Sequence, residues 1–579
     1  MPDSSQVQPA AFNCEGGLVL NRSTFLMQPG EALELENFEP DIQGGYRRIS
    51  GHAKYVHQIV PQTSLSSEKI LLVTTFANKV VAARGEKIFI SASNELGAKI
   101  LSTTSMSGSG VITLNSTTGF SSSGTVQISD EIFTYTGVSG KTLTGVTRAT
   151  SSSVAAEHVL RDVVSENWTT VDTGRTNAVK YRYERFNFDG NDKIIVVDET
   201  NAPTVFNAAG AATDVGNSAV AGSKFIAAYK SHMFYAGKST APAEMVFSEP
   251  FDEDGFTAGD GAGSIKVDDD IVGLKVFRDS LFIFCTNRIF KLTGSTLADF
   301  SIQPVTRNIG CINGDTIQEF GGDLVFLGPD GLRTVAATAR IGDTELGTIS
   351  RNVQSIFDAN IKDSDLFESV VLQDKTQYRL FFTKADQSDN ITRGVTCVMR
   401  ADKYEFSELR GIKPSATDSF VEEGNVIVLH GDFSGFIHRQ EVGNTFDGTP
   451  ILGRYRSPDM SFGDTGIRKH MQRVIVNFKP ESTISADLFV RYDNEAADSA
   501  RPDAYAFDST QTFSQFGSAL FSSLDGTARF VFGGPSQPLV RQAVEGSGFS
   551  VALKVNDNQT TAPYSLKGFQ LEYQLGARR

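Results

Sequence analysis

Short runs of hydrophobic residues, closed every few positions by glycine, asparagine, aspartate or proline, fill almost the whole chain. Many of these runs alternate hydrophobic and polar residues, which places successive side chains on opposite faces of a strand. Helical spacing is nearly absent. Its clearest instance is Ser350–Ile361, where Val353, Ile356, Phe357 and Asn360 fall at i, i+3, i+4 and i+7. The pattern predicts an all-β chain with a short helix in this stretch.

From about Ile59 onward one unit recurs: a strand, a tight polar turn and a second strand of similar character. Radially repeated four-stranded sheets produce such blocks at a spacing of about 40–50 residues, because each blade needs neighbours to cover its faces. We therefore expect a β-propeller of about six to eight blades over 56–100 and 167–449, with a string of β-sandwiches as the alternative. The seven blocks are Ile70–Ala92, Lys193–Ala208, Lys224–Lys238, Gly273–Gly294, Thr316–Ala337, Ser369–Lys384 and Asp418–Gln440.

Three other stretches depart from this repeat. Over 101–166 the sequence is rich in Ser, Thr and Gly, which predicts a small β-domain inserted in a blade loop, where insertions are tolerated. After His438 the strands become longer and several alternate cleanly, as one face of a sandwich does. We expect a β-sandwich-like domain over 450–579, and an N-terminal arm with the first strands over 1–55. The strands expected in the insertion are Val111–Leu114, Thr125–Ile128, Glu131–Thr136 and Thr142–Val146.

Length and composition fit several packed domains. The 579 residues exceed the ~250–300 residues at which a single core usually stops growing. With 40% hydrophobic and 21% charged residues, disorder is excluded over most of the chain. The net charge is −15, so the basic footprint of a sequence-reading DNA-binding protein is missing. Residues 450–579 hold 14 Lys and Arg against 13 Asp and Glu, a net charge of +1. The other 449 residues therefore carry a net charge of −16. Such an acidic body repels polyanions, although solubility alone would also explain it.

The cysteines and the termini bear on the compartment. Cys14, Cys285, Cys311 and Cys397 form no CxxC pair, and Cys285 and Cys397 lie in apolar runs typical of buried free thiols. The N-terminus lacks the basic and apolar regions of a signal peptide. No apolar run approaches the ~18–20 residues that cross a bilayer. We expect a soluble protein, made in a reducing cytosol, without stable membrane insertion.

Sequence motifs for catalysis are missing. The seven histidines form neither HExxH nor HxH, and the sequence has no GxSxG nucleophile elbow and no P-loop. We therefore predict no catalytic residue, no cofactor, no metal site and no enzymatic activity.

Two acidic clusters are the candidates for a functional surface. Close carboxylates can bind calcium, but neither cluster has the D-x-D-x-D-G spacing of a calcium loop, and a solvated acidic rim is the simpler interpretation. If the propeller axis is a channel, the same carboxylates are the candidates to line it, and they would act through their electric field. The clusters are Asp252, Glu253 and Asp254, and Asp268, Asp269 and Asp270.

Several stretches, in order along the chain, resemble parts of known virion proteins. Cys14–Tyr55, with its Gly44-Gly45-Tyr46-Arg47-Arg48 turn, resembles the opening of bacteriophage tail nozzle (tail tubular, stabilisation-type) proteins. Phe277–Val335 resembles their propeller core, and Arg456–Pro480 resembles the start of their C-terminal β-domain. Gln127–Thr150 is similar to small modules inserted in various phage virion proteins. In the turn at Gly44–Arg48 the two glycines would permit a sharp bend of the backbone. Arg47 and Arg48 would either pair with acidic partners or be solvated.

The resemblance implies a structural role. Nozzle proteins form a ring, usually of six copies, below the portal-adaptor assembly of a short-tailed phage, and this tail tube is the conduit for genome ejection. The implied partners are further copies of the chain in a hexamer, the tail adaptor protein, tail fibres as a further candidate, and transiting DNA bound without sequence specificity. The implied location is the virion tail, after assembly in the host bacterial cytoplasm. An acidic lumen suits this role, because Lys and Arg contacts to phosphates are what create affinity for DNA.

Two other functions remain open at this point. The chain could be a minor tail or head-completion protein of a longer-tailed phage. It could also be a propeller-borne carbohydrate-degrading enzyme, which a concave pair of carboxyl groups with one raised pKa would favour.

Overall fold

The computed structural model describes residues 6–578 except 57–58, 62–68, 78, 92–97, 100–109, 118–119, 129–130, 151–152, 156–157, 159–162, 167, 177, 336–347, 384–392, 401–402, 423, 482–483, 496–503 and 509–538. Strands dominate this part of the chain, as the alternating pattern predicted. Helix α2 (Gln354–Asn360) lies in the stretch with helical spacing, and its Ile356 and Phe357 are buried. No helix among the described residues is long and apolar enough to cross a membrane. Short 3-10 turns are η1 (Thr24–Leu26), η2 (Ala258–Asp260), η3 (Gly314–Thr316), η4 (Arg351–Val353) and η5 (Asp493–Glu495).

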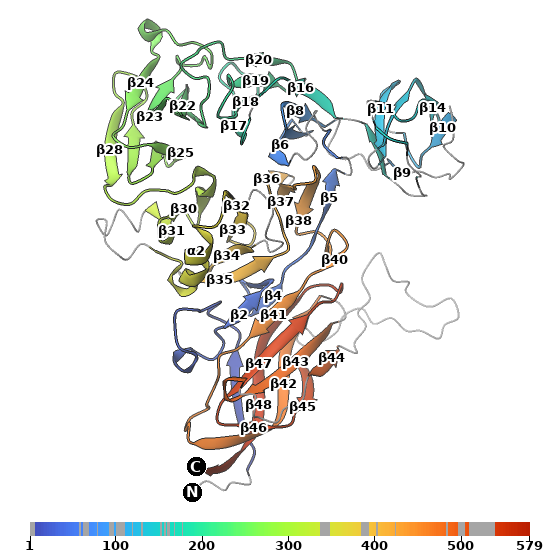
Figure 1. The fold of residues 1–579 in the computed structure, drawn as a ribbon, viewed down its shortest axis with the longest axis vertical. Coiled ribbons are helices and arrows are strands. Elements are labelled where there is room, and N and C mark those ends of the chain that lie inside the picture. The colour runs from blue at the N-terminus through green and yellow to red at the C-terminus, as the bar shows by residue number, and fades with distance from the viewer. Residues whose placement is uncertain are drawn as a thin grey trace.

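Seven sheets form a closed ring, the propeller, in the upper part of Figure 1. The inner strand of each sheet faces the axis, and the inner strand of the last sheet contacts that of the first, which closes the ring. The prediction of a propeller with about six to eight blades is confirmed, and the alternative of separate sandwiches is wrong for this region. The inner strands are β6 (Ile70–Phe76), β17 (Arg182–Phe186), β21 (Phe225–Tyr229), β25 (Ile271–Phe277), β29 (Gln318–Phe320), β32 (Leu366–Leu372) and β36 (Ala416–Glu422).

The outer strands follow the inner ones as hairpins, except in the first and last sheets. The first sheet continues with β7 (Lys79–Arg84), β8 (Lys87–Ile90) and β16 (Thr169–Asp172). The next three add β18 (Lys193–Val197), β19 (Thr204–Asn207) and β20 (Ala212–Asp214); β22 (His232–Lys238), β23 (Ala241–Phe247) and β24 (Gly263–Lys266); and β26 (Ser280–Cys285), β27 (Ile289–Thr293) and β28 (Ser301–Thr306). The last three add β30 (Asp323–Gly328) and β31 (Gly331–Thr334); β33 (Gln377–Thr383), β34 (Arg393–Arg400) and β35 (Lys403–Arg410); and β37 (Asn425–Gly431) and β38 (Ile437–Gln440).

The seventh sheet is completed by a strand from the N-terminal part of the chain. Strand β5 (His52–Val56) pairs antiparallel with β38, so that His52 lies opposite Gln440. The short strands β39 (Thr445–Phe446) and β40 (Thr449–Pro450) extend the same sheet beyond β5. Because β5 precedes every other propeller strand in the sequence, the first and last parts of the propeller are hydrogen-bonded to each other.

Below the propeller in Figure 1 lies a two-sheet sandwich, which confirms the predicted C-terminal domain. The first four strands of the chain belong to this sandwich rather than to a separate arm. One sheet consists of β1 (Gln8–Asn13), β3 (Phe38–Pro40), β4 (Tyr46–Arg48), β42 (Ile467–Pro480), β45 (Leu539–Ala543), β46 (Ser547–Gly548) and β48 (Tyr564–Arg578). The other consists of β2 (Glu34–Glu36), β41 (Gly453–Arg456), β43 (Ser485–Tyr492), β44 (Tyr505–Asp508) and β47 (Val551–Asp557).

The Gly44–Gly45 turn brings β4 against β48. Both glycines have φ of +87°, a left-handed conformation that a side chain disfavours. A Cβ atom at Gly45 would also lie 2.4 Å from the carbonyl oxygen of Leu566. This close approach explains why the turn needs glycine at the second position.

The propeller and the sandwich share one sheet. Strand β35 of the sixth propeller sheet pairs in parallel with β2, where Glu408 lies opposite Glu36, so that β32–β35 and the second sandwich sheet form nine continuous strands. A single hydrophobic cluster also spans the joint and includes Tyr378 and Phe406 of the propeller and Tyr455 of the sandwich. The two parts are therefore joined by a packed interface and by backbone hydrogen bonds, and no free linker separates them.

The predicted inserted domain is present between β8 and β16 of the first propeller sheet. Its described strands form two small sheets with a core of their own that includes Ile112, Val126, Phe133 and Leu143. The strands are β9 (Ala98–Lys99), β10 (Gly110–Thr113), β11 (Gly124–Ile128), β12 (Glu131–Tyr135), β13 (Gly137–Ser139), β14 (Thr142–Val146) and β15 (Val163–Glu166).

The four cysteines are buried free thiols, as predicted for Cys285 and Cys397. Burial raises the pKa of the Cys285 and Cys311 thiols to about 12. These thiols are therefore protonated at neutral pH and behave as small hydrophobic side chains.

Candidate functional site: the propeller axis and a histidine cluster

A cavity of about 340 Å³ lies on the propeller axis and is lined by residues from the inner region of all seven sheets. Its wall is rich in charge, and inner strands such as β17 and β36 supply part of this charge. The charged side chains in the wall are Lys180, Arg182, Glu184, Lys275, Asp315, Glu368 and Asp418.

Arg182, from β17, is the centre of the ion pairs around this cavity. Its Nε and Nη2 donate to the two carboxylate oxygens of Asp315 across 2.7 and 2.9 Å, and its Nη1 donates to Glu199 across 2.8 Å. Burial alone would raise the pKa of Asp315, but Arg182 and Lys180 outweigh it and hold that pKa below its usual range. The pair therefore stays ionised at neutral pH and ties the second sheet to the turn that precedes β29.

The other carboxylates of the wall also have polar partners. Lys180 Nζ donates to Glu368, whose second carboxylate oxygen accepts from Thr417 Oγ1 across 3.1 Å. Asp418 accepts from Thr74 Oγ1 across 2.7 Å and lies 3.5 Å from an Arg185 nitrogen. Burial raises the pKa of both Glu368 and Asp418, and the nearby cations only partly offset it.

Glu184, also from β17, differs from these carboxylates because no ion pair joins it to a described residue. Burial in the cavity wall raises its pKa to about 7, against the opposing effects of Lys275 and of the backbone N–H of Ala228. A carboxyl group with this pKa can hold or release a proton near neutral pH. Glu184 therefore has the protonation behaviour of a general acid.

The size of the axial cavity limits what can occupy it. The major groove of B-DNA alone is about 12 Å wide. A duplex cannot pass through a space of about 340 Å³ that is crossed by ion pairs. The cavity can hold water or a small polar molecule.

The six carboxylates that the sequence singled out do not line this cavity. Asp252, Glu253 and Asp254 follow β23, where Glu253 pairs with Lys193 across 2.8 Å. Asp254 accepts from the backbone N–H of Gly216 across 3.1 Å. The carboxylates of the axial cavity come instead from strands β17, β32 and β36 and from the turn η3.

The second acidic cluster lies between β24 and β25. Asp268 pairs with Arg288, and Asp269 accepts from the backbone N–H of Asn287 across 2.6 Å and from its side chain across 3.2 Å. Asp270 is exposed, like Asp252, and neither carboxylate has an ion pair among the described residues. The two clusters are thus partly used in local contacts and partly free at the surface.

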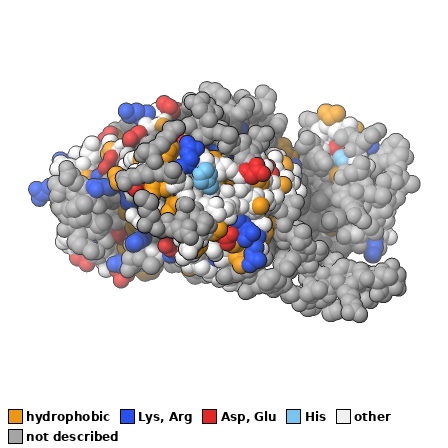
Figure 2. All heavy atoms as spheres, turned by 90° about the horizontal axis from the view of Figure 1, so that it is seen from below, with side chains coloured by type: hydrophobic (Ala, Val, Ile, Leu, Met, Phe, Trp, Pro, Cys, Tyr) orange, Lys and Arg blue, Asp and Glu red, His pale blue; other side chains and the backbone are white. Residues whose placement is uncertain are grey.

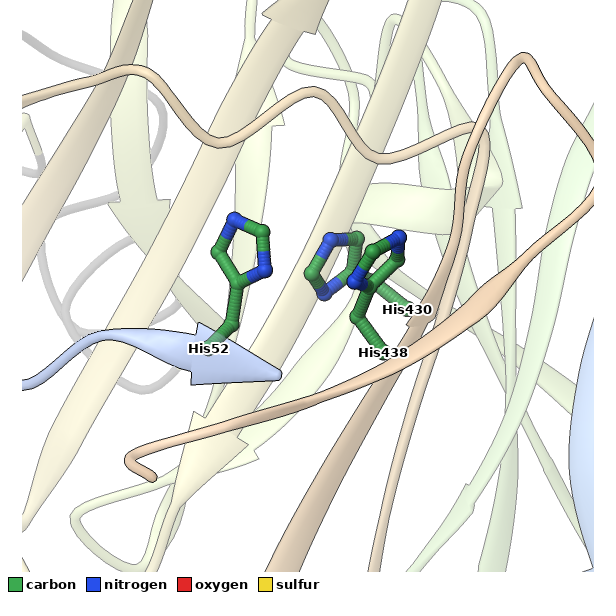
Figure 3. A group of neighbouring side chains, drawn as sticks. All are labelled: His52, His430 and His438. Atoms are coloured by element: carbon green, nitrogen blue, oxygen red, sulfur yellow. The ribbon is translucent and has the colours of Figure 1, made fainter. Parts of the chain in front are cut away.

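A second constellation, which no sequence motif indicated, is formed by His52, His430 and His438. Figure 3 shows His52 of β5 facing the stacked rings of His430 and His438, which come from β37 and β38. Each pair of ring centroids is 4.9 Å apart, and all three side chains are buried. Among the described residues this is the one group of three or more His, Cys, Asp or Glu side chains whose ligand atoms all lie within 4.8 Å of one another.

The end of the sandwich carries no continuous patch of one charge in the view from below. Figure 2 shows acidic, basic and hydrophobic side chains interspersed on this face, beside residues that are not described. The mixture agrees with the nearly neutral balance of residues 450–579.

Comparisons with known proteins add only distant likenesses. No protein-family model and no curated protein matches the chain. Among solved structures, Chaetomium thermophilum Raptor matches with 7% identity and a TM-score of 0.34, covering 69% of this chain and 29% of that one. Kluyveromyces lactis Hsv2 matches with 8% identity and a TM-score of 0.27, covering 60% and 98%. An exo-beta-1,3-galactanase from Phanerochaete chrysosporium matches with 9% identity and a TM-score of 0.22, covering 80% and 99%. Likenesses this distant say nothing about activity, substrate or partner.

Proposed function

We propose that this chain is a structural virion protein that forms the tail nozzle of a short-tailed bacteriophage, a tube below the portal-adaptor complex through which the genome leaves. The observation that carries the proposal is the nine-stranded sheet that runs from the propeller into the sandwich. It accompanies a resemblance to nozzle proteins in Cys14–Tyr55, Phe277–Val335 and Arg456–Pro480, which lie in the expected order.

A subunit in the wall of such a tube must keep its shape while it transmits load between the adaptor and the tip. Domains of one chain usually move relative to each other unless their interface is large and hydrophobic. Here the N-terminal segment from Gln8 to Val56 supplies four strands to the sandwich and the closing strand to the propeller, so the two parts hold each other. This construction suits a rigid wall element better than an enzyme whose domains open and close.

The path of the genome would lie between copies of the chain. The axial cavity of one propeller is far too small for a duplex, so a conduit needs several copies arranged around a common axis. Nozzle proteins usually assemble as hexamers, and we propose the same number here, with the tail adaptor protein above the ring and tail fibres as further partners. Further copies of the chain would thus be the main partner.

The charge of the chain fits a lumen through which DNA slides without being held. Each copy carries −15, and charges act over about 8–10 Å at physiological salt. Exposed carboxylates without ion pairs act on the phosphates most strongly, because no neighbouring cation offsets them. Asp252 and Asp270 meet this condition within their clusters, and we propose them as lumen residues.

Mass photometry of the purified full-length chain, followed by cryo-EM of the particles, tests the proposal. We expect a closed ring with a wide acidic channel, formed by the chain alone or on addition of the tail adaptor protein. A chain that stays monomeric at micromolar concentration under both conditions would contradict the nozzle. A ring found at the head-to-tail junction of a long-tailed particle would instead support a minor tail or head-completion protein.

One observation favours the alternative of a carbohydrate-degrading enzyme, namely the raised pKa of Glu184 in a concave site. Glycoside hydrolysis needs a second carboxylate beside the acid. The other carboxylates of the cavity are engaged by Arg182, Lys180, Thr417 and Thr74. The test is whether the pure chain hydrolyses host polysaccharide and whether Glu184→Gln abolishes this activity. If both hold, the chain is an enzyme, and a nozzle role alone would not describe its function.

A further inference from the structure

We propose that His52, His430 and His438 bind one divalent metal ion of the zinc class, which clasps the ring-closing strand β5 to β37 and β38. The site is independent of the proposed nozzle function, since it lies within a single propeller sheet. Its role would be structural: to fix the N-terminal strand in the last sheet of the ring.

The geometry brings three imidazoles around one point. The three ring centroids form a triangle with sides of 4.9 Å, and a ring nitrogen of His52 faces the other two rings in Figure 3. Tetrahedral zinc with bonds of 2.0–2.1 Å needs ligand nitrogens about 3.3–3.4 Å apart. The ligand atoms lie within 4.8 Å of one another, so modest rotations of the side chains would bring them into position.

Two of the three side chains present a nitrogen that nothing else uses. Nδ1 of His52 and Nδ1 of His438 are buried, and neither has a hydrogen-bond partner among the described residues. Leaving a buried polar atom unpaired destabilises the folded state, so a ligand at these nitrogens would remove that cost. Nδ1 of His430 has only a long contact of 3.4 Å with Gln440 Nε2, which a metal ion would readily replace.

The imidazole of His438 also contacts a carboxylate through its other ring nitrogen, as metal-bound histidines usually do. Its Nε2 lies 3.1 Å from Asp432 Oδ2, and the neutral tautomer that donates Nε2–H to this carboxylate has its lone pair on Nδ1. Asp432 is itself held by the backbone N–H groups of Ser434 and Phe436, across 2.9 and 2.8 Å. A carboxylate behind the imidazole orients the ring and increases its basicity as a ligand.

The nature of the ligands selects the kind of ion. Imidazole nitrogen suits zinc, copper, nickel and iron, whereas calcium and magnesium prefer oxygen ligands. Three protein nitrogens leave a fourth position for a water molecule or a small anion. We therefore expect zinc or cobalt to bind, and calcium and magnesium not to bind.

A metal ion at this point would have a definite mechanical effect. His52 precedes His430 by 378 residues in the sequence, and β5 is held in the sheet by its pairing with β38. Coordination would add one link across this seam, from His52 on β5 through the metal ion to His430 and His438. Release of β5 would then require loss of the metal ion.

The test uses the full-length, tag-free chain after treatment with a chelator and dialysis. Cobalt titration followed by d–d absorption should show saturable binding of one ion per chain with a tetrahedral spectrum, which zinc then displaces. Zinc should also raise the midpoint of thermal unfolding followed by Trp168. This residue is the single tryptophan of the chain and packs in the same cluster as Ile437 of β38.

Matched variants assign the binding to the cluster. His52→Gln and His438→Gln should each weaken cobalt binding at least tenfold, and Asp432→Asn should weaken it about 10–100-fold. His470→Gln, which changes an exposed histidine of the sandwich, should leave binding unchanged. Asp432→Asn keeps all three ligands, so its result stands even if a ligand variant fails to fold.

Two outcomes would overturn the proposal. One is the lack of saturable cobalt or zinc binding by the wild-type chain in the micromolar range. The other is binding of the same affinity and spectrum in wild type, His438→Gln and Asp432→Asn, because the ion would then be bound elsewhere.

Discussion

Arg48 Nη1 donates a hydrogen bond to Asp557 Oδ2 across 2.7 Å, and both side chains are completely shielded from solvent. The same guanidinium donates to the carbonyl oxygens of Thr561 across 2.7 Å and of Asn444 across 3.3 Å. One side chain therefore connects the N-terminal strand β4, the segment that follows β38, strand β47 and the loop between β47 and β48. The sequence left open whether this arginine is paired or solvated, and it is paired.

Removal of one partner of this buried pair should destabilise the sandwich strongly. Arg48→Met leaves Asp557 as an unpaired buried carboxylate, and we expect a loss of about 3–5 kcal/mol in the free energy of unfolding. Urea unfolding followed by far-UV circular dichroism measures this loss. Glu481→Gln is the control, because it weakens the pair of Arg47 with a side chain that is 43% exposed. That pair should contribute at most about 1 kcal/mol, and an equal loss in both variants would refute the assignment.

A second buried ion cluster at the joint should make the chain sensitive to acid. Glu441 accepts from Arg379 and Lys375, and although burial opposes ionisation, these two cations lower the pKa of Glu441 to about 2. Its contribution to stability is therefore present above pH 4.5 and lost as the pH falls towards 2. Glu441→Gln should be less stable at pH 7 by about 2–4 kcal/mol, and the difference from wild type should shrink steadily below pH 4.5. Denaturant unfolding between pH 2.5 and 7 checks this, and a difference that is constant with pH would contradict it.

The inserted domain should be dispensable for the propeller. Ile90 of β8 lies opposite Thr169 of β16, so the two strand ends are already adjacent without the insertion. A variant that joins Ser91 to Trp168 through a short Gly-Asn loop keeps both of these buried residues. We expect the unfolding transition reported by Trp168 fluorescence to shift by no more than about 1 kcal/mol. Loss of the cooperative transition would show that the insertion is part of the propeller core.

Glu184 should have the opposite pH dependence to Glu441. The pKa of Glu184 is raised from 4.5 to about 7 in the folded chain. Its ionisation therefore destabilises the folded state progressively as the pH rises from 4.5 through 7. Glu184→Gln removes this charge but keeps an oxygen that can accept from the backbone. The variant should exceed wild type in stability by about 1–2 kcal/mol at pH 8 and match it below pH 4.5. Thermal unfolding at both pH values tests this, and a variant that is less stable at pH 8 would count against a buried, costly charge.

Local features of the fold could be predicted from the sequence because they depend on neighbouring segments. The hairpins of the propeller and the small inserted domain have their turns and their alternation within a few dozen residues, so the pattern indicates both strands at once. The burial of Ile356 and Phe357 in α2 was likewise visible in the helical spacing.

Long-range features could not be predicted in this way. Strand β4 pairs with β48, and Arg48 reaches Asp557 across 509 residues of sequence, with no local signal for that register. The same holds for His52. Its neighbours His430 and His438 are adjacent in space but lie in the last propeller strands of the sequence, far from His52 along the chain. The acidic runs at 252–254 and 268–270 are recognisable in the sequence because they are contiguous, whereas the carboxylates at the axis come singly from separate strands and from the η3 turn.

If Asp252 and Asp270 line the proposed lumen, reversing their charge should slow genome ejection, whereas the same charge change elsewhere should not. Asp252→Lys combined with Asp270→Lys changes the net charge of each copy from −15 to −11 at two exposed sites without ion pairs among the described residues. If these sites face transiting DNA, the added lysines will bind phosphates, and ejection of the genome in vitro should slow most strongly at low salt. The control pair Asp363→Lys and Asp374→Lys changes the net charge equally at exposed positions next to the sixth propeller sheet. Slower ejection in the first variant alone would support lumen positions for Asp252 and Asp270, whereas equal rates in wild type and both variants at low salt would refute them.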